Sequence, residues 1–473
     1  MIFVASTKWG PFHLAGAAQE QVLRVILRFV TLGILCGMLA FRVASAEAPR
    51  EPTAAPLPQP PGYSLEQILT LAREHNPEIV SARHSVESAR ANIQIAAARP
   101  NPNLTLQAVS INPKGVGSGP FYDKTVDSSV RVDQLFERGM KREMRCGNAE
   151  ALALAAQADL SESIRVQLGT VTQAYYDLKL ATEKHRITRE TVALYQDTLK
   201  AADLRYKAGD VSRTDVARLR VDASRARSDA LQAKADLLRS QQALATLLGG
   251  EVPAQQFVTA DRWPSVQSTP EPETEQVSTP LADARPDVRG AWFRVQAADA
   301  GRKLAKAQTT RDVTVGVQIE RFPGPGNSGN TVGISIAVPL FIAYNYEGEI
   351  RKAESDRDAA QASLNKTRAL ARADLYKTDT DMRAAGERAN LYRKGLVDDA
   401  RRVADAAEFA YKKGAMGLLD LLDARRTFRA VQLEAASAEA DLAKAAAAYG
   451  AAREIVRNAT LLQNPPACSV DRK

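Results

Sequence analysis

The chain has 473 residues, of which 45% are hydrophobic but only 6% are aromatic. This composition, rich in alanine, is typical of long packed helices and argues against one compact globular core. The formal net charge is +8, and because basic and acidic residues are interspersed along the chain, a nucleic-acid-binding patch is not expected.

The N-terminus has the pattern of a secretion signal. Arg24 and Arg28 precede an apolar run at 29–41, and small residues suited to cleavage follow it. At about 13 residues, this run is too short to cross a bilayer of about 30 Å as a helix. We therefore expect residues 1–46 to be removed on export, which leaves a Pro-rich leader, 47–62, at the start of the mature chain.

The first structured segment combines helices with a hairpin. Ser64 and Gln67 form a capping box at the start of a helical pattern, and Pro77 divides that pattern into a short and a longer helix. Apolar and polar residues then alternate over 103–111 and 127–136, with a Gly/Pro-rich connection between them. This alternation predicts two antiparallel strands.

A pair of long helices follows the strands. Helical periodicity runs without proline from about 139 to 207, a glycine-containing turn occupies 208–212, and a second helix covers 213–248. At 1.5 Å per residue the longer helix would reach about 100 Å. A proline-rich polar linker, 251–284, closes this half of the chain.

The second half repeats the elements of the first. Residues 285–307 align with 76–98, and the equivalent pairs include Pro77 with Pro286, Tyr206 with Tyr411, Gly209 with Gly414 and Asp215 with Asp420. Strands are expected at 312–320 and 331–341, and helices at 346–413 and from 418 to beyond 452. The agreement of sequence and element order indicates an internal duplication.

The sequence therefore predicts six segments. They are the signal 1–46, the leader 47–62, the first repeat 63–250 (strand hairpin 102–136, helical turn near 208–212), the linker 251–284, the second repeat 285–457 (strand hairpin 311–341, helical turn near 414–417) and a C-terminal tail 458–473.

Two strands per repeat give four per chain, which cannot close a barrel or bury their edges in lipid. A dimer would give eight strands and a filled interior, whereas a trimer would give twelve and a wet lumen. The polar positions Thr314, Gln318 and Glu320 favour the trimer. Because the helices carry charge on every turn, we expect them to extend into the periplasm; a soluble helical coil with incidental hairpins is the alternative.

The duplicated order of elements, the stretch "PLFIAYNYEGEIRKAESD" (339–356) and the two turn motifs resemble the TolC-like outer-membrane efflux family over residues 62–457. The similarity is greatest to the branch that serves heavy-metal and other resistance-nodulation-division (RND) exporters. The resemblance implies a mainly α-helical homotrimer: a twelve-stranded outer-membrane β-barrel, four strands per chain, continuous with a periplasmic coiled-coil tunnel. The tunnel would be closed at its inner end by the helical turns.

By the same resemblance, 205–216 and 411–422 are the tips that contact the periplasmic adaptor and form the gate. The residues assigned to adaptor contact are Gly209, Val211, Gly414, Met416 and Leu418. A link between tyrosine and aspartate helps to close the gate in the family, and Tyr411 and Asp215 occupy those positions. Met416 stands where characterised members carry an arginine, so an arginine lock of that form is not expected.

Asp420 and Asp423 lie three residues apart, on one face of the last helix. In a trimer they would form two stacked rings of carboxylates, which favour cations in a pore. The alternative is a solvated helix face on which Asp420 caps the turn. The tip motif favours the rings.

The function implied is the outer-membrane channel of a tripartite efflux system. It would be a passive duct for heavy-metal cations or drugs, its partners being outer-membrane lipid, a periplasmic adaptor (membrane fusion) protein and an inner-membrane RND transporter. The alternatives are a duct for type I protein secretion and, in a different class, a periplasmic adaptor or structural coiled-coil protein.

Neither enzymatic chemistry nor a cofactor is expected, because the histidines of the mature chain lack ligand spacing and the tip acids lack a nucleophilic or histidine partner. Cys146 and Cys468 of the mature chain exclude a disulfide framework and leave a single bridge open. Met140, Met144 and Cys146 could bind a soft metal, but ordinary helix packing is favoured.

Overall fold

The computed structural model describes residues 62–109, 127–264, 275–322 and 329–453. All of them belong to the compact unit Pro60–Lys473. The expected signal, the leader up to residue 61 and the C-terminal tail lie outside the described residues, as does most of the connection inside each strand hairpin.

The first two helices are set by their caps. Helix α2 (Leu65–His75) begins after Ser64, whose hydroxyl accepts from the Gln67 N–H while the Gln67 side chain accepts from the Ser64 N–H. Asn76 ends α2 and caps α3 (Pro77–Ala97) by accepting from the first N–H groups of that helix. Pro77 therefore stands at the first helical position, where its missing N–H is not needed.

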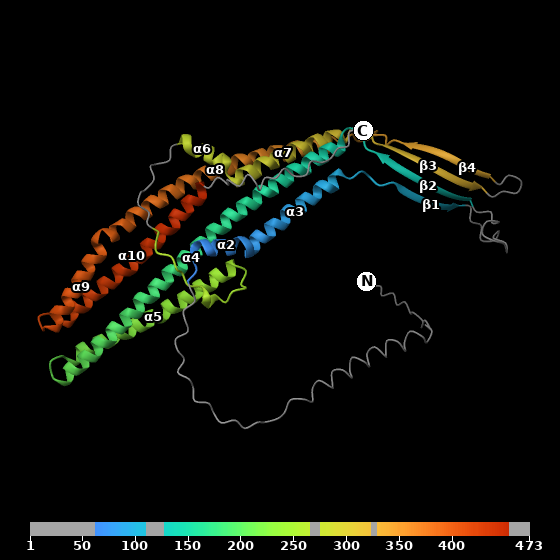
Figure 1. Cartoon of the computed structure of the whole chain (residues 1–473). Helices are drawn as coiled ribbons and strands as arrows, with labels where there is room; N and C mark the ends of the chain where they lie inside the picture. The colour runs from blue at the N-terminus through green and yellow to red at the C-terminus, as the bar shows by residue number, and fades with distance from the viewer. Residues whose placement is uncertain (1–61, 110–126, 265–274, 323–328, 454–473) are drawn as a thin grey trace, which may run out of the picture. The chain divides into compact units, whose positions relative to one another are not determined.

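The strands form one antiparallel sheet in chain order: β1 (Asn103–Val109), β2 (Asp127–Phe136), β3 (Val313–Phe322) and β4 (Gly329–Ala337). Strands β2 and β3 lie side by side and join the two halves of the chain (Figure 1). In their register Val130 pairs with Ile319. Because neighbouring residues of a strand point to opposite faces, the register gathers apolar side chains on one face of the sheet and polar side chains on the other.

One face of the sheet is apolar and exposed. Its members are Leu104, Leu106, Val130, Val132, Val317, Ile319, Val332, Ile334 and Ile336. The other face is polar: Arg131 donates to the Asp133 carboxylate at 2.8 Å and to the Ser335 hydroxyl at 2.9 Å. A Cβ at Gly316, which lies between these partners, would overlap both of them, so the glycine gives the ion pair its space.

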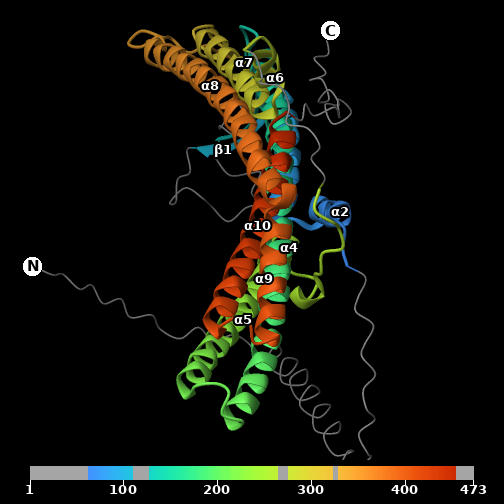
Figure 2. The ribbon, with the colours of Figure 1, turned by 90° about the vertical axis from the view of Figure 1, so that its left-hand side faces the viewer.

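Helix α4 (Lys141–Lys207) packs against α3, α5 (Arg213–Leu247), α7 (Pro286–Ala307) and α10 (Leu418–Arg453). In the second half, the helix expected over 346–413 is interrupted. It consists of α8 (Glu347–Leu391), a π-helical turn (Tyr392–Leu396) and α9 (Val397–Lys412). The turn from α4 to α5 and the turn from α9 to α10 lie toward the same end of the helices (Figure 2).

The interruption has a local cause, and a single uninterrupted helix was the wrong expectation. Gly395 has φ +135°, a conformation that side chains with a Cβ rarely adopt and that breaks the regular helical hydrogen bonding. Arg393, in the same turn, pairs with Glu439 of α10. The break is therefore held against the neighbouring helix.

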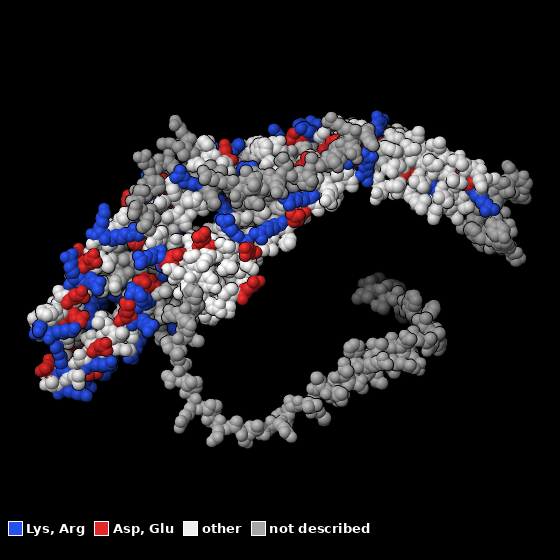
Figure 3. All heavy atoms as spheres, viewed as in Figure 1, with Lys and Arg blue, Asp and Glu red and all other residues white. Residues whose placement is uncertain are grey.

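Charged residues of both signs are interspersed over the helices, whereas few lie over the strands (Figure 3). None of the described helices is both long and apolar enough to cross a membrane.

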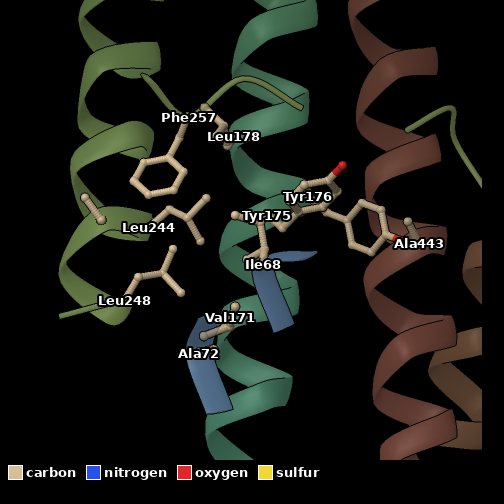
Figure 4. Packing of buried hydrophobic residues seen from close by; sticks show 11 residues of the cluster. Ile68, Ala72, Val171, Tyr175, Tyr176, Leu178, Leu244, Leu248, Phe257 and Ala443 are labelled. Atoms are coloured by element: carbon tan, nitrogen blue, oxygen red, sulfur yellow. The ribbon is translucent and has the colours of Figure 1, made fainter. Parts of the chain in front are cut away.

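The segment expected as a polar linker contributes to the core. It contains a 3-10 turn (Ala254–Gln256) and α6 (Glu275–Ala284). Phe257 is fully buried against α4 and α5 in the cluster shown in Figure 4. Asp261 accepts from the Tyr175 hydroxyl at 2.9 Å and from the Leu65 N–H at 2.7 Å, so the segment also ties α2 to α4.

Candidate functional site

The two helical turns at the tips have the same backbone. Gly209 has φ +85° and Gly414 has φ +76°. In each turn the N–H of the residue after the glycine bonds a carbonyl in the last turn of the helix: Asp210 to Arg205 and Ala415 to Ala410, both at 2.9 Å. This is the Schellman arrangement, which requires a left-handed residue after the helix, and it explains why both repeats carry glycine there.

The ends of four helices share one hydrophobic cluster, which we call the tip core. Its buried members come from α4, α5, α9 and α10: Tyr195, Ala202, Val216, Leu219, Ala223, Ala226, Ala407, Leu418, Leu421 and Leu422. The two helical hairpins of one chain are therefore packed together at their tips.

The residues expected to contact an adaptor differ in exposure. Val211 and Met416 are half-buried and pack against the tip core. Leu418 lies inside that core with 8% of its surface exposed, so it supports the tip instead of presenting a side chain to a partner. Its neighbour Leu419, which sequence reasoning missed, is 56% exposed.

Asp420 and Asp423 are both exposed, on the side of α10 opposite Leu421 and Leu422, which are buried. Within the part of the chain that the structure describes, neither carboxylate has a hydrogen-bonded or ion-paired partner. Asp420 therefore does not cap the turn with its side chain. The pair is available to ions or to groups outside this chain.

Tyr411 and Asp215 do not bond each other in this chain. The Asp215 carboxylate accepts from the Ser212 hydroxyl at 2.7 Å, and Ser212 caps α5 by accepting from the Asp215 N–H. The Arg205 guanidinium lies over the Tyr411 ring, 5.0 Å from its centre. Within one chain, the contact of Asp215 is therefore a helix cap and that of Tyr411 is a cation–π contact.

Arginines of α10 connect the hairpins about two to three turns from the start of that helix. We call Arg425, Arg426 and Arg429 the arginine row. Arg426 donates to both carboxylate oxygens of Asp222 on α5, each at 2.7 Å, and Asp222 is buried. Arg429 pairs with Asp229, also on α5, at 2.7 Å. Both pairs join α10 to α5 through charge-assisted hydrogen bonds, which are stronger than neutral ones.

The first member of the row, Arg425, is buried and faces the other way. It donates to the Thr198 hydroxyl of α4 at 2.6 Å and to Glu408 of α9 at 3.0 Å. Glu408 also pairs with Lys412 at 2.7 Å. The hydrogen bond from Lys412, followed by that from Arg425, lowers the pKa of Glu408, and the hydrogen bond with Asp222 raises the pKa of Arg426.

Sequence reasoning missed the arginine row, although the stretch "DARRTFR" after the second tip carries a signal for it. Two adjacent arginines and a third one turn later leave a helix in different directions, so they can reach different neighbours. Met416 packs against the tip core, and the arginine contacts of α10 lie further from the tip.

Cys146, buried near the start of α4, is disulfide-bonded. It therefore offers no thiolate to a soft-metal site with Met140 and Met144, which corrects that alternative. Among the described residues, no group of three or more histidine, cysteine, aspartate or glutamate side chains could hold a metal ion.

Comparison with known proteins gives one consistent picture. The family model described as outer membrane efflux protein matches residues 68–250 and 280–451. The cobalt-zinc-cadmium resistance protein CzcC of Cupriavidus metallidurans is 25% identical over 84% of this chain and 92% of its own length. The pyoverdine export outer membrane protein OpmQ of Pseudomonas putida is 24% identical over 78% of this chain and 81% of its own.

Among solved structures, the Campylobacter jejuni CmeC outer membrane channel superposes with a TM-score of 0.70 at 14% identity. The match covers 82% of this chain and 85% of CmeC. At this identity the superposition establishes the fold.

Proposed function

Because the chain belongs to the outer membrane efflux protein family, we propose that it is the exit duct of a tripartite efflux system. It is located in the outer membrane and extends into the periplasm. Substrates reach it from an inner-membrane RND-type transporter through a periplasmic adaptor. The chain itself carries out no chemistry on them. Membership of this family argues against the periplasmic adaptor alternative.

The observation that carries the proposal is the two-faced sheet. Nine exposed apolar side chains on one face suit contact with lipid, while Arg131, Asp133 and Gln318 give the other face a polar surface. Strands β1 and β4 are the edges of the sheet, and four strands are too few to close on themselves. Three copies would supply twelve strands and enclose a wet lumen.

The helical tips form the gate in this proposal. The tip core and the arginine row hold the two hairpins of each chain together, which supports a closed resting state. Three copies would bring Asp420 and Asp423 into rings at the inner end of the tunnel. Exposed carboxylates without partners among the described residues suit that role, because they can interact with passing cations. The exposed surface around Gly209, Val211, Gly414 and Met416 is where the adaptor docks.

We favour heavy-metal cations as the substrates. One support is the tip acids, and the other is the relative CzcC, which is named for cobalt, zinc and cadmium resistance. OpmQ, named for pyoverdine export, is almost equally similar, so identity alone does not select between metals and organic compounds. The transport phenotype of a deletion strain distinguishes metal substrates from organic ones.

Deletion of the gene in its own bacterium tests the proposal. We expect lower tolerance of at least one divalent metal salt, restored by the full chain expressed from a plasmid. If the deletion strain is sensitive to drugs alone, the chain is still an efflux duct but its substrates are drugs. If it fails only to secrete one protein, type I secretion is favoured. Unchanged growth and unchanged secretion, with the protein absent from the outer membrane, would overturn the proposal.

A further inference from the structure

A cavity of about 570 Å³ lies where strand β2 passes into helix α4. It is lined by residues 134–143 together with Arg99 and Pro100, which belong to the connection between α3 and β1. We infer that this cavity binds the phosphate headgroup of an anionic phospholipid from the periplasmic leaflet of the outer membrane. The inference rests on the proposed function, because the location of the chain places this end of the sheet at that leaflet.

The strands fix the level of the cavity. The last residue of β2, Phe136, pairs with the first residue of β3, Val313, and we call this end of the sheet the sheet base. Helix α4 begins only five residues after Phe136. Basic side chains stand at the boundary between the helices and the sheet (Figure 3). The sheet base is therefore the level at which an apolar, lipid-facing surface gives way to a charged one, which is where headgroups lie.

The second repeat has an interfacial composition at the same end of the sheet. Leu340 and Ile342, which follow β4, are exposed. The ring of Phe341 contacts that of Tyr346, with 5.3 Å between their centres, and the Arg311 guanidinium lies 5.5 Å from the centre of the Phe341 ring. Aromatic rings and long basic side chains of this kind are enriched at membrane–water interfaces.

The lining of the cavity carries more basic than acidic side chains. Its ionisable members are Arg99, Glu137, Arg138, Lys141, Arg142 and Glu143. Both carboxylate oxygens of Glu137 accept from the Arg145 guanidinium. Lys141 donates to the Asp312 carboxylate at 2.8 Å. These two lining residues are thus compensated by partners within the chain.

The remaining lining charges favour an anion. Arg99 and Arg138 are exposed, and neither guanidinium has an acidic partner in the described ranges. Arg142 donates to the Ala97 carbonyl at 2.6 Å, which holds its positive charge at the lining. Against these three stands Glu143, the one lining acid without an ion-pair partner among the described residues. Arginine suits a phosphate, because its planar group can donate two parallel hydrogen bonds to it.

The apolar neighbours of Arg138 favour a lipid over free phosphate. Phe136 and Met140 also line the cavity, and they are 54% and 62% exposed. Phe136 belongs to the apolar face of the sheet, since it is in step with Val130 and Val132 along β2. The acyl chains of a phospholipid can lie on this face while its phosphate reaches the arginines. Free phosphate would gain nothing from the apolar part of the surface.

Lipid binding to the purified full chain tests the inference. The protein is delipidated in a nonionic detergent and incubated with phosphatidylglycerol or with phosphatidylcholine of the same acyl chains. Native mass spectrometry then counts the lipids bound per chain. We expect at least about fivefold more phosphatidylglycerol than phosphatidylcholine, the factor that one basic residue near an anionic surface contributes.

Two results of this experiment would overturn the inference. One is equal binding of the two lipids. The other is displacement of phosphatidylglycerol by inorganic phosphate at the same concentration, which would make the cavity a site for free anions. Retention of phosphatidylglycerol in the presence of inorganic phosphate supports a lipid.

Variants assign the preference to the cavity. In Arg99→Gln combined with Arg138→Gln, the ratio of phosphatidylglycerol to phosphatidylcholine should fall close to one. Arg99→Lys combined with Arg138→Lys keeps both charges and should retain most of the preference. Glu143→Gln should raise the preference, because it removes the opposing charge; this arm does not depend on the fold tolerating the loss of two arginines. An unchanged ratio in the glutamine double variant, or a lower one in Glu143→Gln, would contradict the assignment.

The matched control is Arg225→Gln combined with Arg227→Gln. Both of these arginines are exposed on α5 and, within the described part of the chain, have no acidic partner. This control should bind phosphatidylglycerol like wild type. Failure of the inference is distinguishable from failure of the proposed function. A lost lipid preference with the protein still in the outer membrane overturns the lipid site alone, whereas absence of the protein from that membrane counts against the duct itself.

Discussion

The guanidinium of Arg426 on α10 donates to both carboxylate oxygens of Asp222 on α5, each at 2.7 Å. The contact joins the second repeat to the first, seven residues beyond Asp215, at a point where the carboxylate is buried and the guanidinium is partly exposed. Separating a buried carboxylate from its partner costs more free energy than separating an exposed one, because the buried charge is then left without compensation. This pair is therefore a polar link between the two hairpins of the chain whose loss leaves a buried charge without its partner.

Replacement of Asp222 by Ala should loosen the tip. The change removes the acceptor of Arg426 and leaves the tip core in place, so we expect normal assembly with a severalfold higher conductance in planar bilayers. Asp229→Ala is the matched control, because the carboxylate of Asp229 is about half exposed and exposed ion pairs contribute only about 0–1 kcal/mol. Equal conductance of the Asp222 variant and wild type would place the restraint elsewhere.

Acid should weaken the contact between α9 and α10 through Glu408. Hydrogen bonds from Lys412 and Arg425 hold the pKa of Glu408 below its ordinary value of 4.5 in the folded chain. A lowered folded pKa stabilises the fold above the unfolded pKa, and that stabilisation is lost as the pH falls through the folded pKa.

The corresponding measurement is the unfolding temperature in detergent at about pH 6 and about pH 3. The unfolding temperature of wild type should fall more between these two pH values than that of Glu408→Gln, which cannot titrate at this position. The difference between the two proteins isolates Glu408 from other carboxylates. A larger fall in the unfolding temperature of Glu408→Gln would contradict the claim that ionised Glu408 stabilises the fold.

The tip glycines should tolerate no β-branched side chain. Gly414 has φ +76° in open space, so the cost of Gly414→Val is backbone strain of roughly 1–3 kcal/mol and not a clash. We expect loss of efflux, measured as metal tolerance of cells, with trimer and outer-membrane insertion retained. Gly450→Ala serves as the control, because Gly450 is helical and also has open space around it. Wild-type tolerance in Gly414→Val would remove the reason to place the adaptor contact at this turn.

The tip acids should set ion preference. Asp420→Ala combined with Asp423→Ala removes two exposed carboxylates per chain, so cation preference in planar bilayers and block by trivalent cations should both decrease. Folding should be unaffected, because neither acid has a partner among the described residues. Asp398→Ala, an exposed acid on α9, is the control. Unaltered selectivity in the double variant would make these acids ordinary helix-surface residues.

Periodicity and turn chemistry predicted most of the fold. The longest helix, expected over 139–207, is Lys141–Lys207, because an uninterrupted pattern without proline has no competing structure. The break at Gly395 was missed, since one glycine in a helical pattern does not by itself reveal its φ. The packing of Phe257 was missed because a single aromatic residue in a polar segment carries no periodic signal.

The candidate site was predicted less completely than the fold. Both tip turns follow from local rules, since a glycine after a helix is a signal that the sequence carries. The partner of Asp215 is the nearby cap Ser212, but the contact of Tyr411 with Arg205 and the pairing of Asp222 with Arg426 depend on which helices adjoin. Such contacts join residues about 200 positions apart, and no local pattern specifies them.

The proposal that this chain forms a gated duct is tested most directly by conductance across a planar bilayer, recorded for wild type and Asp222→Ala under the same conditions. The account predicts small conductance steps for wild type and severalfold larger ones for the variant. If correctly inserted protein gives no conductance in either form, the chain does not form a duct closed at its helical tips.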